Sequence, residues 1–513
     1  MLRQTCVVAF AALLLIGCAK QVKEEVAVEV VMTETVMDSS TEESAEPRSG
    51  VALVPLNPLR SVAWAPLSTF SVDVDTGSYS RTRRALREGL PTWPELVRTE
   101  EFLNYFDYGY PDPTPAGPPL SVTTELAAAP WEPRRQLLLV GLQGRRIEAR
   151  ELPPANLVFL IDTSGSMQTP DRLPLLQEAF RTMSASLRAV DRVAIVTYAG
   201  SAGLVLPSTP GNERGRIVDA LESLAAGGGT DGGAGIELAY EVARKSFIRG
   251  GTNRVILATD GDFNLGTTSV DELKAMVAAR RASGIALSTL GFGAADYHDA
   301  MAEQLADVGN GNHAYIDDAL EGRKVLAREL GATLHTIAAD VKIQVEFNPA
   351  LVAEYRLLGY ENRALANRDF ADDKVDAGEI GAGHDVTALY ELVLHGSGAE
   401  RLPPSATANP TGYAFGPETL AEVRVRFKRL EQAASELIVR PVQRAELATS
   451  ASPRLQFAAA VAAFAERLRE SEHLGDYGYA QIAAAAQTAG LADPHGEHAE
   501  FADLVELTGA ATR

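Results

Sequence analysis

The sequence predicts a multidomain α/β protein: a doubly wound parallel sheet, with a flanking β-sandwich-like domain and a C-terminal helical segment. Its 513 residues exceed one ordinary domain, and 46% hydrophobic residues are enough to build several cores. Between residues 154 and 335, continuous apolar strands alternate with amphipathic helices, which is typical of a parallel sheet covered on both faces. On either side the pattern changes to strands whose side chains alternate in polarity.

Residues 1–17 have the pattern of a lipoprotein signal peptide. A basic residue precedes the apolar run 7–16, which is too short to span a bilayer. The following Leu15-Ile-Gly-Cys18 resembles the lipobox of bacterial lipoproteins, so Cys18 is the expected lipidation site. A cleaved secretory signal with an incidental cysteine is the alternative. Cys6, the other cysteine, leaves with the signal, so the mature chain is expected to have no disulfide.

Residues 18–60 predict an acidic, disordered tether, because they are rich in Glu, Ser and Thr and contain no aromatic residue. The whole chain has a formal charge of −21, from 47 basic and 68 acidic residues. That balance argues against nucleic-acid binding, which depends on basic surfaces. We expect a lipid-anchored protein of the cell envelope. In a Gram-negative host, Ala19 after the lipidated cysteine favours the outer membrane, facing the periplasm or the cell surface.

Residues 61–115 form a segment of their own before the flanking strands. The sequence predicts a short strand at 70–74, a helix at 79–87 and a second helix at 94–106. Proline just inside the start of the second helix, at Pro94, is a typical helix opening.

The flanking β-rich domain is expected to come from two separate parts of the chain. Residues 116–153 alternate like strands but are too few to form an independent sheet, and residues 336–445 return to strands. We therefore predict that the two parts pack together, with the central domain of residues 154–335 inserted between them. Residues 446–513 are predicted to be helical.

The central domain has the rhythm of strand, helix, strand. The expected strands are 157–162, 193–198, 254–259, 285–293 and 313–317. The expected helices are about 173–187, 212–224, 233–247, 270–282 and 298–308. In such sheets, ligands bind beyond the carboxyl ends of the strands.

Five oxygen-bearing side chains are expected at the carboxyl edge of this sheet, four of them at strand ends and one in a loop that precedes a helix. Asp162, Ser164 and Ser166 follow the first strand, Thr230 lies in a glycine-rich loop, and Asp260 ends a later apolar strand. Because parallel strands deliver these loops to one edge, we expect the five side chains to converge. Two carboxylates and three hydroxyls are hard ligands that suit Mg²⁺, Ca²⁺ or Mn²⁺ and suit zinc poorly. A helix cap or turn is the alternative for the first three residues alone.

This set resembles the metal-ion-dependent adhesion site of von Willebrand factor type A domains. The resemblance implies that Ser164, Ser166 and Thr230 contact the metal directly, whereas Asp162 and Asp260 act through bound water. It also implies that the last metal position is filled by an acidic residue of a partner protein. Mg²⁺ is the cation we expect.

The resemblance extends to both sides of the central domain. STFSVDVDTGSYS and EEFLNYFDYGYP before it, and YRLLGYENRALANRDF after it, are similar to a bacterial family of von Willebrand type A lipoproteins. These proteins have a characteristic N-terminal segment and a C-terminal domain of unknown function. The similarity covers nearly all of the mature chain and implies an architecture and a site.

The sequence thus predicts a membrane-anchored binding protein and no enzyme. Through the metal, it would bind an unidentified protein with an exposed acidic residue, and no nucleic acid. A metal-dependent envelope hydrolase is one alternative. A metal that only stabilises the sheet edge is another. A second acidic run, from Asp372 to Glu379, is interpreted as a solvated loop, with calcium binding as the alternative.

Overall fold

The strand that leads to the expected site, β5 (Ala155–Asp162), lies in the middle of a six-stranded sheet in the computed structural model. The structure describes residues 55–72, 75–228, 232–261, 269–293, 300–329, 335–403, 415–430, 432 and 434–512. The signal peptide and most of the expected tether therefore lie outside the described residues. Residues from Pro47 onward belong to one compact unit.

The central sheet has the order β10-β9-β8-β5-β6-β7. Its strand β5 pairs in parallel with β6 and β8, whereas β7 runs antiparallel at one edge. The sequence analysis did not predict β7. The bounds of the other strands are β6 (Arg192–Tyr198), β7 (Ala202–Pro210), β8 (Thr252–Thr259), β9 (Ala286–Gly291) and β10 (His313–Tyr315).

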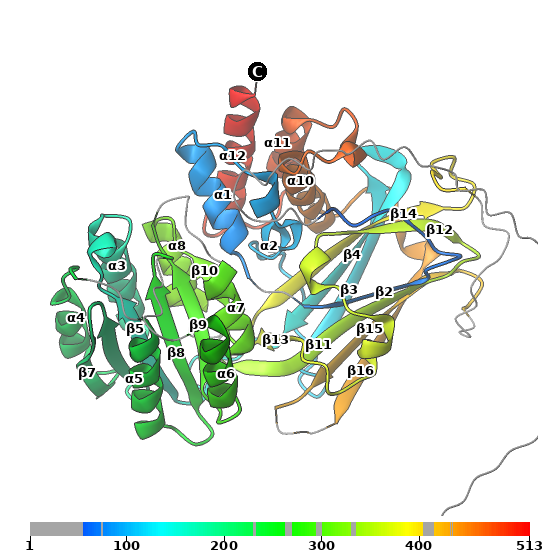
Figure 1. The fold of residues 1–513 in the computed structure, drawn as a ribbon. Coiled ribbons are helices and arrows are strands. Elements are labelled where there is room, and N and C mark those ends of the chain that lie inside the picture. Colours follow the sequence, from blue (N-terminus) through cyan, green and yellow to red (C-terminus); the bar gives the residue numbers. More distant parts are fainter. Residues whose placement is uncertain are drawn as a thin grey trace, which may run out of the picture. The chain divides into compact units, whose positions relative to one another are not determined.

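Helices cover both faces of this sheet, as Figure 1 shows. Alternate residues of β5 belong to different cores: Phe159 packs with Phe180 on one face, and Leu160 packs with Tyr240 on the other. The predicted doubly wound fold is thereby confirmed. The helices are α3 (Leu173–Ser184), α4 (Arg214–Glu222), α5 (Gly232–Lys245), α6 (Val270–Arg281), α7 (Ala300–Val308) and α8 (Ala319–Arg323), which continues as a π-helix, Lys324–Glu329.

Two further sheets form a sandwich. One has the order β1-β12-β14-β4-β3-β17, and the other has the order β13-β11-β15-β16, with β2 also paired to β11. An apolar core with Phe347, Tyr355 and Tyr390 fills the space between them. The strands are β1 (Arg60–Ser61), β2 (Leu67–Ser71), β3 (Leu120–Ala129), β4 (Glu132–Gly144), β11 (Thr336–Phe347), β12 (Val352–Leu358), β13 (Gly378–Gly381), β14 (Asp385–Leu394), β15 (Thr419–Lys428), β16 (Ser435–Gln443) and β17 (Leu447–Ala448).

The sandwich is built from both sides of the central domain. Strand β4, which precedes that domain, pairs antiparallel with β14, which follows it, from Gln136–Leu392 to Gln143–Asp385. The prediction that the two strand regions pack together is confirmed. The central domain is thus inserted into the sandwich, and its two connections leave the sandwich close to each other.

The N-terminal segment packs against the C-terminal helices (Figure 1). Its helices are α1 (Gly77–Arg87) and α2 (Thr99–Leu103), and the C-terminal helices are α10 (Pro453–Leu468), α11 (Tyr479–Thr488) and α12 (Glu497–Ala511). Edge-to-face rings, such as Phe106 against Phe457 at 5.1 Å, join the two sets. Helix α1 also contacts the edge strand β10 of the central sheet.

Two predictions for the N-terminal segment need correction. The helix expected over 94–106 is a 3₁₀ turn, Pro94–Leu96, followed by α2, with extended backbone at Val97 and Arg98. Ser78 of α1 explains the break, because its hydroxyl donates to Leu96 O at 2.7 Å and accepts from Arg98 N at 3.0 Å. The strand expected at 70–74 is instead β2, and residues 73 and 74 lie outside the described residues.

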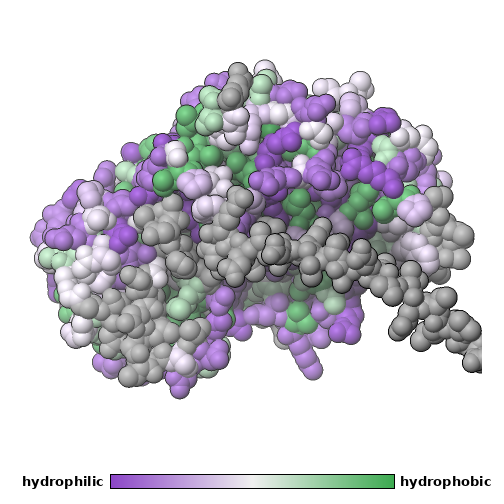
Figure 2. Space-filling view, turned by 45° about the horizontal axis from the view of Figure 1, so that its top comes forward, coloured by the Kyte–Doolittle hydropathy of each residue, from purple (hydrophilic) through white to green (hydrophobic). Residues whose placement is uncertain are grey.

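On the face drawn in Figure 2, hydrophilic residues predominate and apolar residues form small, scattered patches. Such a surface is normal for a protein that is in contact with water. None of the described helices has the length and apolar character needed to cross a membrane.

Candidate metal centre

Asp162 is the last residue of β5 and is completely buried. Its Oδ1 accepts a hydrogen bond from the backbone N–H of Ser164 at 2.8 Å, which stabilises a turn directly after the strand. The hydroxyls of Ser164 and Ser166 lie 2.9 Å apart and hydrogen-bond to each other. One turn therefore presents three oxygen-bearing side chains at the carboxyl edge of the sheet.

Asp260 directly follows β8, the neighbour of β5, and its side chain is 1% exposed. Because β5 and β8 run parallel with Ile161 opposite Ala258, Asp260 lies at the same edge as Asp162, and its charge contributes to the raised pKa of Asp162. Arg172, the residue before α3, connects the two loops: its Nη1 lies 2.5 Å from Asp260 Oδ2 and donates to Ser166 O at 2.8 Å. The structure therefore brings four of the five expected residues together.

Thr230, the fifth expected residue, lies outside the described residues. The chain that leads to it is fixed at the site, because Gly227 N–H donates to Thr163 O at 2.8 Å and Gly165 N–H donates to Gly228 O at 3.3 Å. The role of Thr230 stays a prediction.

The electrostatics of Asp162 fit a cation. Burial raises its pKa to about 6, Asp260 adds to this effect, and hydrogen bonds from Ser164 oppose it. Within the described part of the chain, its buried Oδ2 accepts no hydrogen bond of ordinary geometry, although the nearby Tyr198 hydroxyl also lowers the pKa. A water ligand of a divalent cation would donate to this oxygen, and the cation would reduce the repulsion between the two carboxylates.

The described residues contain no group of three or more His, Cys, Asp or Glu side chains placed to hold a metal. A metal at this edge would therefore depend on hydroxyl and water ligands, which suit Mg²⁺. Arg172 is the residue that the sequence analysis missed. No local sequence signal marks it, because its position depends on contacts with residues far away in the chain.

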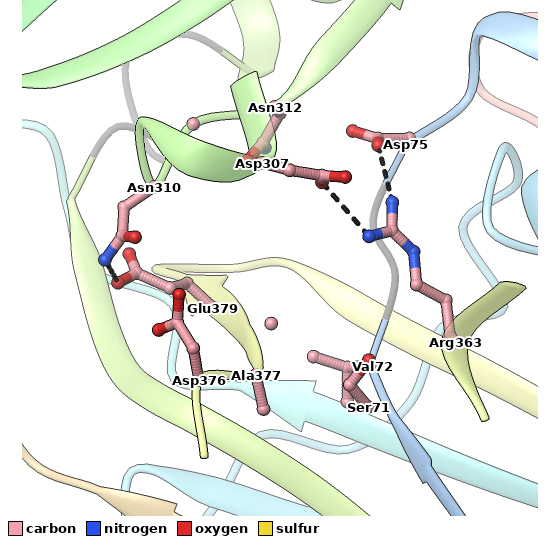
Figure 3. A pocket seen from close by; sticks show the side chains of 12 residues that line it. Ser71, Val72, Asp75, Asp307, Asn310, Asn312, Arg363, Asp376, Ala377 and Glu379 are labelled. Atoms are coloured by element: carbon pink, nitrogen blue, oxygen red, sulfur yellow. Dashed lines mark hydrogen bonds and ion pairs between the residues drawn. The ribbon is translucent and has the colours of Figure 1, made fainter. Parts of the chain in front are cut away.

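The acidic run from Asp372 to Glu379 lies beside a cleft, and other side chains of the chain pair with two of its residues. A cleft of about 180 Å³ lies where the central domain meets the sandwich (Figure 3). In it, Arg363 pairs with Asp75 at 3.2 Å and with Asp307 at 3.0 Å. Two residues of the acidic run also line the cleft: Glu379 accepts a hydrogen bond from Asn310, and Asp376 pairs with Arg281 at 2.6 Å. The interpretation of the run as a solvated loop fits Asp376, which is exposed, but is wrong for Glu379, which lies in β13 and is largely buried.

A larger cavity of about 550 Å³ lies where the N-terminal segment, the sandwich and the C-terminal helices meet. His384, His495 and His498 line it together with Asp385. Burial raises the pKa of Asp385 to about 7, and the charge of Asp107 adds to this effect. The carboxyl is therefore partly protonated near neutral pH, which lowers the cost of placing it in this junction.

Three protein families match successive parts of the chain. The family described as von Willebrand factor matches residues 52–139, and the von Willebrand factor type A domain matches residues 156–327. The family described as "Uncharacterized protein YfbK, C-terminal" matches residues 332–510.

Relatives extend this match. "Uncharacterized protein YfbK" of Escherichia coli is 46% identical over 466 residues, which are 89% of this chain and 80% of that protein. The 60 kDa subunit of magnesium chelatase from Rhodobacter capsulatus is 33% identical over 28% of this chain and 27% of its own length. Among solved structures, a von Willebrand factor type A protein from Catenulispora acidiphila aligns over 72% of this chain and 80% of its own, with 18% identity and a TM-score of 0.40.

Proposed function

This chain belongs to the YfbK family of bacterial proteins with a von Willebrand factor type A domain, and we propose that it captures a protein partner through a divalent cation bound beyond β5 and β8. The type A domain is a protein-interaction or adhesion-type domain. The finer function rests on one observation: a buried Asp162 with a raised pKa lies beside two paired serines and close to a second carboxylate.

The residues have distinct roles in this proposal. Ser164, Ser166 and Thr230 contact the cation, and Asp162 and Asp260 balance its charge and orient its water ligands. The cation, Mg²⁺ in our proposal and Ca²⁺ or Mn²⁺ as alternatives, supplies an electrophilic position that a carboxylate of the partner can fill. Nothing in the described part of the site favours the hydrolase alternative, so we propose no enzymatic activity.

Partner capture tests this function. Envelope extract is passed over the immobilised parent chain with Mg²⁺ or with excess chelator, and over Asp162→Ala and Asp219→Ala with Mg²⁺. Asp219 is exposed on α4, so its variant makes the same charge change away from the candidate site. We expect the parent and Asp219→Ala to retain the same protein with Mg²⁺, and chelator or Asp162→Ala to release it.

A second arm tests the acidic group. Amidation of carboxyl groups in the extract is expected to prevent capture by the parent chain. Retention that is insensitive to chelator and to Asp162→Ala would contradict the proposal. Metal binding without any metal-dependent retention would favour a purely structural metal.

We also propose that the chain is anchored to the membrane by a lipid on Cys18, in the outer membrane of a Gram-negative cell. The support is the sequence Leu15-Ile-Gly-Cys18. Cys18→Ala is expected to move the protein from the membrane fraction to the soluble envelope fraction, because a lipid provides the membrane affinity. Cys6→Ala is the matched control and should leave the protein membrane-bound. Membrane retention of Cys18→Ala in a fractionation assay would show that the anchor is wrong.

A further inference from the structure

Arg172 places a positive charge of the chain itself at the candidate metal centre. The side chain is only 19% exposed and pairs with Asp260 Oδ2 at 2.5 Å. The same nitrogen, Nη1, donates to the backbone oxygen of Ser166, one of the expected metal ligands. The guanidinium therefore lies between the two loops that form the site.

Gly293, two residues after the end of β9, packs closely against the side chain of Arg172. Its φ is +103°, and a Cβ added there would lie 2.6 Å from Arg172 Nε. Any larger residue would therefore displace the guanidinium. Gly293 O is in turn fixed by hydrogen bonds from Arg84 Nη1 and from the Tyr315 hydroxyl.

Arg84 belongs to α1, so the N-terminal segment reaches the rim of the site. Its Nη2 pairs with Asp171 Oδ2 at 2.7 Å, and Asp171 directly precedes Arg172 in the chain. Arg84 thus contacts two residues next to Arg172: the Asp171 carboxylate and the backbone oxygen of Gly293. The guanidinium is therefore placed by Asp260, Ser166 and Gly293 within the central domain, and Arg84 supports that arrangement from the N-terminal segment.

We propose that Arg172 is a built-in counter-ion, held in place through Arg84 and Gly293, which competes with the divalent cation for Asp260. This inference rests on the proposed metal site. Without metal, the guanidinium neutralises a buried carboxylate that would otherwise be costly. A cation that binds beside Asp260 through water must share that carboxylate with the guanidinium and tolerate a like charge nearby, so Arg172 lowers the affinity for metal.

A purely structural role predicts the opposite sign. Arg172 also donates to Ser166 O, and if that bond mainly shaped the ligand loop, its loss would weaken metal binding. The direction of the change in affinity therefore separates the two roles.

The test is isothermal titration of the detergent-solubilised full chain with MgCl₂ at physiological ionic strength. Arg172→Met is expected to bind Mg²⁺ about tenfold more tightly or better, since a like charge within a few ångströms of the cation is removed. Arg172→Lys keeps the charge and should bind with intermediate affinity. Arg181→Met on α3 is the matched control, because it removes an equal charge from an exposed pair with Glu222 and should change nothing.

If Arg172→Met does not fold, Gly293→Ala displaces the guanidinium without a change of charge, and tighter Mg²⁺ binding is again expected. Unchanged or weaker binding in these variants, or no metal binding in the parent, overturns the inference. Because the readout is metal affinity alone, unchanged affinity in Arg172→Met overturns the inference while capture through the metal stands. Conversely, tighter binding without any partner capture supports the inference while the proposed function fails.

Discussion

Asp162→Ala is expected to abolish the stabilisation that Mg²⁺ gives to the parent chain. A ligand that binds only the folded state contributes about 2.7 kcal/mol at a hundredfold excess over its dissociation constant. The variant loses the buried carboxylate on which the site is built, so its melting temperature should not respond to the cation.

The fold of Asp162→Ala is expected to persist. The substitution leaves one backbone N–H, that of Ser164, without its partner, at a cost of about 1–3 kcal/mol. Removal of a carboxylate next to Asp260 offsets part of this cost, because the like charges no longer repel each other.

Thermal melts of the parent, Asp162→Ala and Asp219→Ala, each with and without MgCl₂, measure this effect. Asp219→Ala should keep the full response. A rise in melting temperature with Mg²⁺ in Asp162→Ala that equals the rise in the parent would show that the turn after β5 does not bind the metal.

The sequence predicted the central sheet well because its strands carry a strong local signal. In β5, an unbroken apolar run contributes side chains to the cores on both faces of the sheet: Phe159 lies in one core and Leu160 in the other. The break between Pro94 and Thr99 could not be predicted in the same way. There, the hydroxyl of Ser78 bonds to backbone groups that a continuous helix would pair internally, and Ser78 lies about twenty residues away in the sequence.

The same distinction holds for the site. Asp162 and Asp260 could be placed from the rule that ligands bind at the carboxyl ends of parallel strands. The role of Arg172 depends on where a long side chain goes, and that is decided by Gly293 and by Arg84 from another segment. Local sequence carries no information on such a contact.

Arg83→Met is expected to lower the free energy of unfolding by about 3–5 kcal/mol, because it breaks a buried ion network. Arg83 is 2% exposed and pairs with Asp317, Glu321 and Glu500. It also donates to the Tyr105 hydroxyl at 2.8 Å. This network joins the N-terminal segment, the central domain and α12, so its loss leaves buried carboxylates without their cation.

Arg87→Met is the matched control, one helical turn further along α1. Arg87 is 39% exposed and pairs with Asp318 at 3.0 Å and with Glu500 at 2.9 Å, so its loss should cost at most about 1 kcal/mol. Urea unfolding at constant pH compares the two variants. Equal losses of unfolding free energy in the two variants would mean that burial of the ion network contributes nothing to stability.

The loss of unfolding free energy in Arg83→Met should also grow as the pH rises. Burial raises the pKa of Asp317 to about 6 in the parent, and Arg83 opposes that rise. Without Arg83, the folded-state pKa of Asp317 rises further, so the folded variant retains a proton that the unfolded chain has released. Stability is then lost as the pH increases through this higher pKa. Urea unfolding should therefore give a larger difference between parent and variant at pH 8 than at pH 5, and a difference that is constant across this range would exclude Asp317 as the source of the loss.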